Sequence, residues 1–333
     1  MSAPPSSAAR TSSASRPKSA VRIEGASCTL RMAGLYALGS ARRILHVRRG
    51  LILMPVQVVT DSTSDISPPE AEELGVKVVP ALVAFGDDVY RDRVDITPTE
   101  FYERLTTARE FPKTSQPSVE AFASVYREVA AEGNDIASIH VSSKLSGTLN
   151  SASIASETSE LETRIELLDS YTAGVGLRAV VEAAAERARE GAPLEEVTAA
   201  ARSVMDRAHV VVTLDTLEYL QKGGRIGRAG ALVGTALRIK PLIHIDGGEV
   251  APFDRVRTRS KALKRLEEVT LEDKTLERLF VIYSDNDASA RQLVEDVTPQ
   301  LPHTRIEVIQ TGPTVGAYLG PNALGICAVR RSP

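Results

Sequence analysis

From Val56 onward, strand patterns and helix patterns alternate along the chain, and this alternation is the feature that most constrains the fold. After the first strand pattern, Ser67 is placed to cap a helix and Pro68 to open its first turn. The same cap, proline and acid recur at 97–100, which predicts a helix to about residue 108. Strands are predicted over 56–60, 76–85, 136–141 and 164–168, with further helices over 118–132, from 148, over 173–190 and over 193–207. Such alternation is typical of a mostly parallel sheet with helices on both faces.

The pattern changes at His209, where hairpin-like units and split strand–helix units replace the regular alternation. Asp215 is expected to cap a short helix that ends at Lys222. Strands are predicted over 209–213, 239–245, 279–284, 304–309 and 325–329, a short strand after the turn at 246–248, and helical stretches up to 237, over 258–269 and over 287–299. The predicted fold class is therefore α/β, with an N-terminal α/β lobe over 55–207 and a C-terminal α+β lobe over 208–331 whose sheet is mainly antiparallel.

The first 53 residues differ from the rest in charge. They hold nine Lys or Arg residues against a single acid, Glu24. Because the whole chain has 40 basic and 43 acidic residues, 54–333 is left with 31 and 42, a net charge of −11. Residues 1–53 are consistent with a disordered basic arm or a targeting segment. We interpret them as a disordered or mis-annotated extension, with translation starting at Met54, directly before the first strand.

Composition argues against several classes of function. The acidic charge of 54–333 is unsuited to nucleic acid. The chain has no run of 18 apolar residues, so no transmembrane helix is predicted. Two cysteines at opposite ends, Cys28 and Cys327, indicate a reducing cytoplasm rather than a disulfide framework. The five histidines show no ligand-like spacing, so no metal site is predicted.

Two segments rich in hydroxyl groups, 114–117 and 142–148, carry the strongest functional signal. Each lies where a loop is expected to lead into a helix. In an open α/β sheet, ligands bind beyond the carboxyl ends of the strands, where helix N-termini present free amides. The pairs 61–62 and 169–170 follow strands at the same edge. Neutral donors suit the binding of a carboxylate better than bond cleavage, although Ser, Thr, Asp and Gly are also ordinary turn residues.

Other motifs point less clearly to a function. A nucleophilic role for Ser146 is not favoured, because no histidine is placed to serve as its base and the G-x-S-x-G elbow is missing. The segment 223–228 lacks the spacing of a phosphate-binding loop, and its glycines are equally typical of a helix end. Arg225 within it suits an anionic phosphate or carboxylate. The glycine-rich segment 316–325 is predicted to be a loop that feeds an edge strand.

Taken in order, these segments resemble the bacterial DegV family. The resemblance covers about 55–331. Eight short motifs in the same order are far more specific than any one of them. The matching stretches are 59–65, 113–117, 142–148, 169–170, 223–226, 240–241, 257–258 and 320–321.

The resemblance implies a two-domain fold in which a long-chain fatty acid is held in a ligand tunnel between the domains. Characterised members of the family are fatty-acid-binding subunits of the bacterial fatty acid kinase system. The chain is therefore expected to present the acid to a separate ATP-dependent kinase for acyl-phosphate formation, in phospholipid metabolism. By the same resemblance it is not an enzyme on its own, has no cofactor, and is cytoplasmic with at most transient membrane contact.

The resemblance also implies the roles of single residues. Thr114 and Ser146 would donate hydrogen bonds to the carboxylate, with Ser115 and the amide of Gly147 nearby. Arg225 would face the phosphate or the kinase. Additional contacts are expected from Asp61, Ser62, Thr148 and Tyr318. The last of these stands where the family often has a histidine, and its phenol can donate to a carboxylate while staying neutral.

An alternative function uses some of the same residues. An enzyme acting on a small phosphorylated or hydroxylated metabolite would place Arg225 and Asp61 in its site. The aromatic content of only 4% favours an aliphatic lining for a lipid chain. A co-purified fatty acid would support the lipid carrier, and turnover of a metabolite by an empty protein would support the enzyme.

Overall fold

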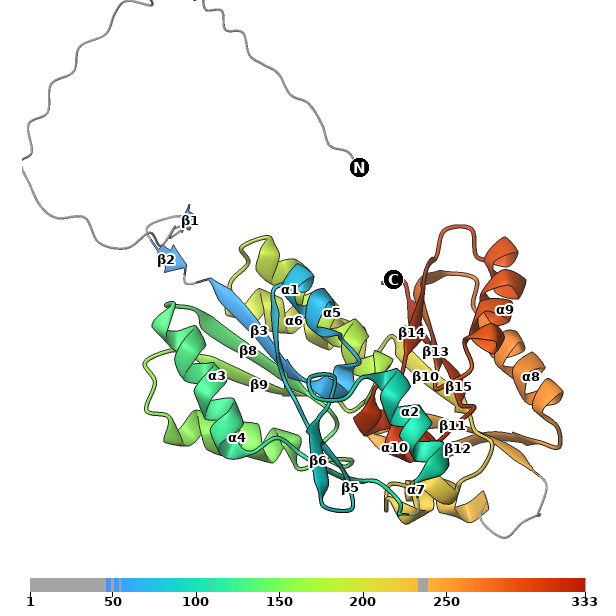
Figure 1. Cartoon of the computed structure of the whole chain (residues 1–333). Helices are drawn as coiled ribbons and strands as arrows, with labels where there is room; N and C mark the ends of the chain where they lie inside the picture. The colour runs from blue at the N-terminus through green and yellow to red at the C-terminus, as the bar shows by residue number, and fades with distance from the viewer. Residues whose placement is uncertain (1–45, 49–50, 54, 109, 233–238, 333) are drawn as a thin grey trace, which may run out of the picture. The chain divides into compact units, whose positions relative to one another are not determined.

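The N-terminal half of the chain is built around a parallel sheet (Figure 1). The computed structural model describes residues 46–48, 51–53, 55–108, 110–232 and 239–332. Neighbouring strands of the sheet all run parallel, as predicted. In spatial order the four strands are β4 (Val76–Val79), β3 (Val56–Asp61), β8 (Asp135–His140) and β9 (Ile165–Asp169).

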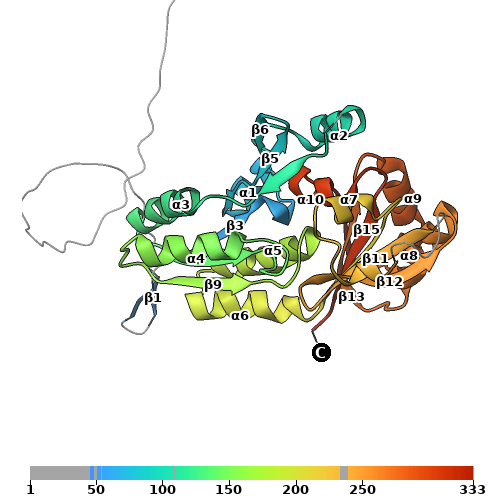
Figure 2. The same ribbon diagram turned by 90° about the horizontal axis from the view of Figure 1, so that it is seen from below.

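Helices cover both faces of this sheet, which confirms the predicted class. Successive strand residues point to opposite faces, so Val58 packs on one side and Val59 on the other. Figure 2 shows β9 between α4 and α6. The Val59 side packs on α3 (Val119–Ala131) and α4 (Thr148–Thr158), and the Val58 side on α1 (Pro68–Leu74), α5 (Val175–Arg189) and α6 (Leu194–Met205).

A smaller antiparallel sheet holds the first hydroxyl segment. The prediction of one strand over 76–85 is wrong, because Pro80 separates two strands that enter different sheets. Thr114 lies on a strand, paired with Val83, and not on a loop. The sheet has the order β6-β5-β7 and comprises β5 (Leu82–Phe85), β6 (Asp88–Arg91) and β7 (Lys113–Ser115), with α2 (Pro98–Thr107) between β6 and β7 in the chain.

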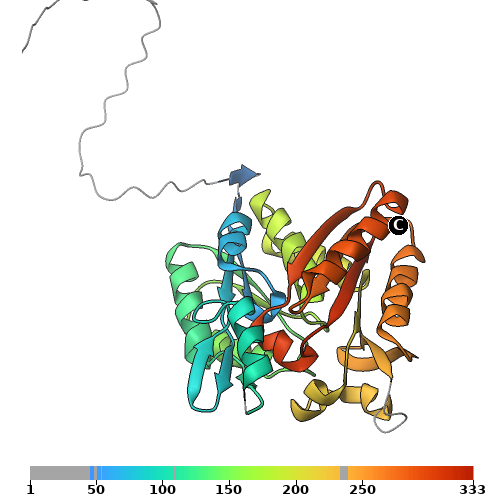
Figure 3. The ribbon, with the colours of Figure 1, turned by 45° about the vertical axis from the view of Figure 1, so that its right-hand side comes forward.

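The C-terminal half forms a six-stranded sheet in the order β12-β11-β10-β15-β13-β14. Its strands are β10 (Ala208–Thr213), β11 (Lys240–Asp246), β12 (Glu249–Val256), β13 (Leu276–Tyr283), β14 (Arg305–Gln310) and β15 (Leu324–Arg330). Neighbours run antiparallel except β13 and β14, which agrees with the predicted mainly antiparallel sheet. One face packs on α8 (Arg259–Leu271) and α9 (Asp287–Val297), and the other on α5. Figure 3 shows this half, in yellow to red, beside the blue and green first half.

Two predictions near the C-terminus are corrected. The segment 316–325 is not a loop throughout, because Pro313–Leu319 forms helix α10. Gly316 lets this helix pack on α2, since a Cβ there would lie 2.4 Å from the hydroxyl oxygen of Tyr102. Strand β15 is not an edge strand, because it lies between β10 and β13. Residues 324–329 are uncharged, which suits a strand with neighbours on both sides and both faces covered.

The turn after β10 also differs from its prediction. Asp215 does not cap the following helix; its carboxylate accepts a hydrogen bond from Lys240 Nζ at 2.8 Å. Thr216 Oγ1 instead accepts from the amide of Glu218 at 3.1 Å, where α7 (Glu218–Lys222) begins. Thr216 therefore holds the first amide of α7, whose N-cap residue is Leu217.

Some predicted segments lie partly outside the described residues. A 3₁₀ turn spans Gly227–Leu232, and the rest of the predicted helical stretch, 233–237, lies outside them. Within the predicted extension 1–53, strands β1 (His46–Arg48) and β2 (Leu51–Leu53) pair antiparallel. The remainder of that extension and Met54 lie outside the described residues. No helix in the described part of the chain is long and apolar enough to cross a membrane.

Ion pairs link helix α5 to α1 and to the six-stranded sheet. Arg178, whose side chain is 4% exposed, donates to Glu182 and Glu70, each at 2.7 Å. Glu182 also accepts from Arg278 of β13, which donates to Glu307 of β14 at 2.7 Å. The network therefore ties α1, α5 and the six-stranded sheet together. Removing one partner would leave a buried charge without compensation.

Candidate functional site

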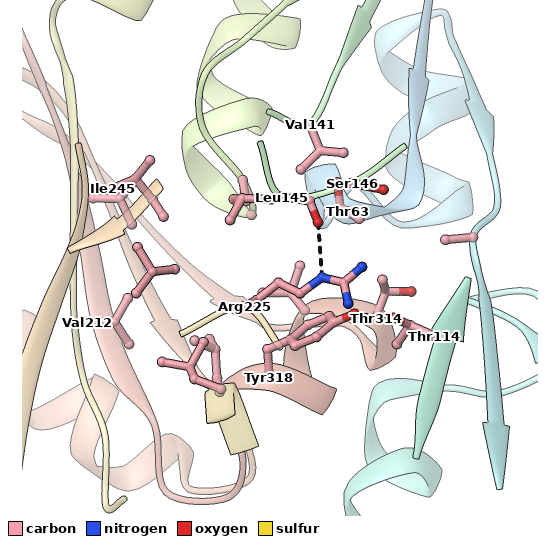
Figure 4. Close-up of a pocket in the computed structure, with 18 of the residues that line it drawn as sticks. Thr63, Thr114, Val141, Leu145, Ser146, Val212, Arg225, Ile245, Thr314 and Tyr318 are labelled. Carbon is pink, nitrogen blue, oxygen red and sulfur yellow. Dashed lines mark hydrogen bonds between the residues drawn. The ribbon is translucent and has the colours of Figure 1, made fainter. Parts of the chain in front are cut away.

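A cavity lies between the parallel sheet and the six-stranded sheet (Figure 4). It encloses about 980 Å³ outside protein atoms, with the open solvent at its mouth included. Most of its wall is aliphatic, as in Val141, Leu145 and Val175 from the N-terminal half and Val210, Val212, Ile243, Ile245, Val250 and Ile282 from the C-terminal half.

Both hydroxyl segments reach this cavity. Thr114 and Ser115 line it from β7, and Ser146 and Thr148 line it from the start of α4. Ser146 Oγ lies 2.8 Å from Thr148 Oγ1 and accepts from the Thr148 amide at 3.2 Å. The structure thus brings together hydroxyls that are about 30 residues apart in the sequence.

Gly147 is the N-cap residue of α4 and is not among the described residues that line the cavity. A Cβ at this position would lie 2.9 Å from Gln116 Nε2. Glycine therefore permits the close approach of the two hydroxyl segments. Its amide, the predicted donor, sits directly between Ser146 and Thr148 in the chain.

Tyr318 of α10 completes the polar end of the cavity. Its hydroxyl is hydrogen-bonded to the hydroxyl of Thr114. The guanidinium carbon of Arg225 lies 5.2 Å from the centroid of the Tyr318 ring, in the range of a cation–π contact. A Cβ at Gly223 would lie 2.5 Å from the same ring, so the glycine lets the tyrosine and the arginine meet. Three residues predicted from separate motifs are therefore neighbours.

Arg225 is positioned by the main chain rather than by a carboxylate. Its Nε donates to the carbonyl of Leu145 at 3.1 Å, drawn as a dashed line in Figure 4, and its Nη1 to the carbonyl of Gly223 at 2.8 Å. Among the described residues, none forms an ion pair with it or a hydrogen bond with its Nη2. It is also the only Lys, Arg, Asp or Glu among the described lining residues. An unpaired guanidinium at the polar end suits an anionic ligand.

Asp61, predicted as an additional contact, does not line the cavity and supports its wall from behind. Its Oδ1 accepts from the amide and the hydroxyl of Thr63, at 3.1 and 2.5 Å. Its Oδ2 accepts from His140 Nδ1 at 3.0 Å and from the amide of Val141 at 3.2 Å. Thr63 and Val141 line the cavity, so this fully buried carboxylate fixes two residues of the wall.

The hydrogen bonds of Asp61 extend away from the cavity. His140 Nε2 lies 2.7 Å from Ser138 Oγ, which lies 2.7 Å from the hydroxyl of Tyr126. With Nδ1 donating to Asp61, the neutral tautomer leaves Nε2 to accept from Ser138, an assignment that follows from the hydrogen-bond pattern. All of these side chains are buried. Both ring nitrogens of His140 are therefore used in hydrogen bonds behind the cavity wall.

Ser62, the other predicted contact that does not line the cavity, holds a second buried acid. Its hydroxyl donates to Asp92 Oδ2 at 3.0 Å and accepts from the amide of Ala81 at 3.0 Å. Asp92 also accepts from the amide of Thr314, a lining residue on α10, at 3.3 Å. Burial, reinforced by the carboxylate of Asp65, raises the pKa of Asp92 to about 6.

Stability should therefore respond to the ionisation of Asp92. Its pKa is raised from the usual 3.8, so its contribution to folding is complete below that pH and is lost as the pH rises through about 6. Relative to Asp92→Asn, the wild-type protein should lose about 2–3 kcal/mol of unfolding free energy between pH 4 and pH 7.5. Urea unfolding at the two pH values measures this difference. Parallel pH profiles of the two proteins would contradict it.

Two hydroxyl residues of the lining, Thr63 and Thr314, are absent from the predicted site. Thr63 belongs to the matching stretch 59–65 and directly follows β3, which was a usable signal. No sequence pattern placed Thr314 against the cavity, because α10 itself was not predicted. The aliphatic lining is spread over several strands, so only the tertiary structure assembles it.

Chemically, the site offers hydrogen-bond donors and one cation without a nucleophile–base pair. The hydrogen bonds of Ser146 Oγ go to Thr148, and His140 is held by Asp61 and Ser138. In the part of the chain that the structure describes, no three His, Cys, Asp or Glu residues are grouped to hold a metal ion. The arrangement is that of a binding site for an amphipathic anion, between a parallel and a mainly antiparallel sheet.

Comparisons with known proteins agree with this class. A family model described as "Uncharacterised protein, DegV family" matches residues 55–331. A DegV domain-containing protein from Halalkalibacterium halodurans is 34% identical over 278 residues, 81% of this chain and 97% of the relative. The chain belongs to the DegV family.

Two solved structures share the fold, each covering 84% of this chain and 100% of the other. One is a DegV family protein from Thermus thermophilus, described by its fatty acid binding, with 35% identity and a TM-score of 0.78. The other is DegV from Bacillus subtilis, described as a fatty acid binding protein, with 31% identity and a TM-score of 0.78.

Proposed function

We propose that this protein binds a long-chain fatty acid and presents its carboxylate to a separate ATP-dependent kinase for acyl-phosphate formation. The observation that carries the proposal is one cavity with aliphatic walls and, at one end, neutral hydroxyls beside the guanidinium of Arg225, which forms no ion pair with any described residue. The structural relatives described as fatty acid binding support the ligand class. In this proposal the carrier is cytoplasmic, and the acyl-phosphate made by the kinase enters phospholipid metabolism.

In this proposal three hydroxyls hold the carboxylate. Thr114 and Ser146 are the proposed donors, with Ser115 and the Gly147 amide nearby. Tyr318, already bonded to Thr114, can donate in place of the histidine often found in the family. The acyl chain then follows the aliphatic wall, which is the proposed position of the tunnel.

The energetics favour a carrier that binds mainly through the acyl chain. Burying roughly fourteen methylenes at ~0.8 kcal/mol each gives ~11 kcal/mol before losses. Each hydrogen bond to the anion adds about 1.5–3 kcal/mol. Ordering the ligand offsets much of this total. The acyl chain therefore supplies most of the affinity, and the hydroxyls decide which end of the fatty acid faces out.

The alternative enzyme would need Asp61 free in the site. That carboxylate instead accepts four hydrogen bonds from within the protein, and the aliphatic wall offers little to a small polar metabolite. Calorimetry of the delipidated protein separates the two functions. Hexadecanoic acid should bind with one molecule per chain, whereas glycerol 3-phosphate should not bind. The opposite preference would overturn the proposal.

Replacing Arg225 tests its proposed role in the phosphorylation of the bound fatty acid by the kinase. Arg225→Ala should retain the fatty acid but lower acyl-phosphate formation by the kinase by about 100-fold, a typical loss for one charge-stabilising group. Arg228→Ala is the matched control, because Arg228 is already paired with Asp246 at 2.6 Å. Measuring acyl-phosphate with both variants checks the assignment. Normal phosphorylation of fatty acid on Arg225→Ala would remove this residue from the mechanism.

A further inference from the structure

A second cavity lies on the face of the six-stranded sheet that packs on α8, opposite the first cavity. It encloses about 650 Å³, open solvent included. Strands β10, β11 and β15 form one side, and the end of α8 with the chain that follows it forms the other. Its apolar residues include Val211, Phe253 and Ile326.

The two cavities share part of their wall at one place in the sheet. Val210, His244 and Ile245 line both of them. The ladder that joins β10 to β11 stops at the pair Val211–His244. Beyond it, 208–210 pair only with β15, and Ile245 pairs only with β12. The strands are therefore not bonded to each other where the cavities adjoin, at the aliphatic end of the first cavity.

The charged groups of the second cavity already have partners. Asp273 lies 3.3 Å from Arg330 Nε, and Glu272 lies 3.2 Å from Arg265 Nη1. A ligand with a second full charge would have to disrupt these pairs. The cavity is therefore better suited to a neutral polar group.

Two imidazoles in this cavity are available for such a group. Neither His209 nor His244 makes a side-chain hydrogen bond to any described residue. Burial lowers the pKa of both below the usual 6.5, and the charge of Arg330 adds to the effect at His209. At neutral pH each ring is uncharged, with one nitrogen that donates and one that accepts. This suits a hydroxyl group.

We propose that the second cavity receives the far end of the acyl chain bound in the first, and that it accepts a hydroxyl group carried at that end. The inference rests on the proposed function. A closed aliphatic slot would penalise a terminal hydroxyl by about 5- to 150-fold in affinity, because the hydroxyl would be buried without a partner. Here the hydroxyl bonds to His209 or His244. The protein should therefore accept ω-hydroxylated long-chain acids.

Calorimetry with hexadecanoic acid and 16-hydroxyhexadecanoic acid tests this on the delipidated full chain. The two dissociation constants should agree within about threefold. In His209→Leu/His244→Leu, the affinity for the hydroxylated acid should fall at least tenfold relative to the affinity for the plain acid. His303→Leu, which replaces an exposed histidine elsewhere, should keep the wild-type ratio.

The outcomes separate this inference from the proposed function. One outcome is that the wild-type protein binds the plain acid but binds the hydroxylated acid more than about fivefold more weakly. In that case the inference is wrong, and the proposed function as a fatty acid carrier is unaffected. An unchanged ratio in the double variant also overturns the role of the histidines. If neither acid binds, both proposals are overturned. If the double variant fails to fold, a crystal structure of the wild-type protein with the hydroxylated acid replaces this test. The terminal oxygen of the acid should lie within hydrogen-bond distance of His209 or His244. Any other position of that oxygen would overturn the inference.

Discussion

Replacing Thr114 by Val and Ser146 by Ala together should weaken the binding of hexadecanoic acid by at least about 100-fold. Each substitution removes a hydroxyl that we propose as a donor to the carboxylate, and each such bond is worth about 1.5–3 kcal/mol. The fold should persist, because the substitutions remove only the side-chain contacts of Thr114 with Tyr318 and of Ser146 with Thr148. Calorimetry with the delipidated double variant measures the loss.

Two controls make this result specific to the headgroup. Ser143→Ala removes an exposed hydroxyl from the same loop and should leave the affinity unchanged. Hexadecan-1-ol lacks the carboxylate, so its affinity should differ much less between the wild-type protein and the double variant. Unaltered binding of the acid by the double variant would show that these hydroxyls do not hold it.

The second large effect concerns stability. Arg178→Met should lower the free energy of unfolding by about 3–5 kcal/mol, because it leaves Glu70 and Glu182 without their shared buried partner. Methionine has a similar length, so little packing is lost. Denaturant unfolding of the purified protein measures the change.

Helix α5 also supplies the matched control. Arg187 lies on the same helix, is 41% exposed and pairs with Glu190 and Glu196. Surface pairs of this kind contribute about 0–1 kcal/mol, so Arg187→Met should have a small effect. Equal losses from the two substitutions would show that burial of the Arg178 network does not determine the stability.

The parts of the fold that were predicted correctly follow from local signals in the sequence. The capping boxes at Ser67 and Thr97 mark the starts of α1 and α2, as expected from a hydroxyl followed three residues later by Glu. The alternation of strand and helix patterns correctly predicted the parallel sheet that holds β3 and β8. Where such signals were weak, the predictions failed: Pro80 divides one expected strand into two, and α10 forms despite its glycines.

The site was harder to predict because it depends on tertiary contacts. Each hydroxyl segment was identified from its own residues, but Tyr318 and Thr114 are 204 residues apart, and no local pattern pairs them. Asp61 was expected at the ligand because it follows a strand. The structure directs its carboxylate to His140, Thr63 and Val141, a set that only the packed sheet can assemble.

Native mass spectrometry of the protein purified without detergent, from cells supplied with long-chain fatty acids, shows whether the cavity holds a fatty acid. We expect one fatty acid per wild-type chain, carried through purification and largely absent from Thr114→Val/Ser146→Ala. An empty wild-type protein, or equal amounts of bound acid in both, would contradict it.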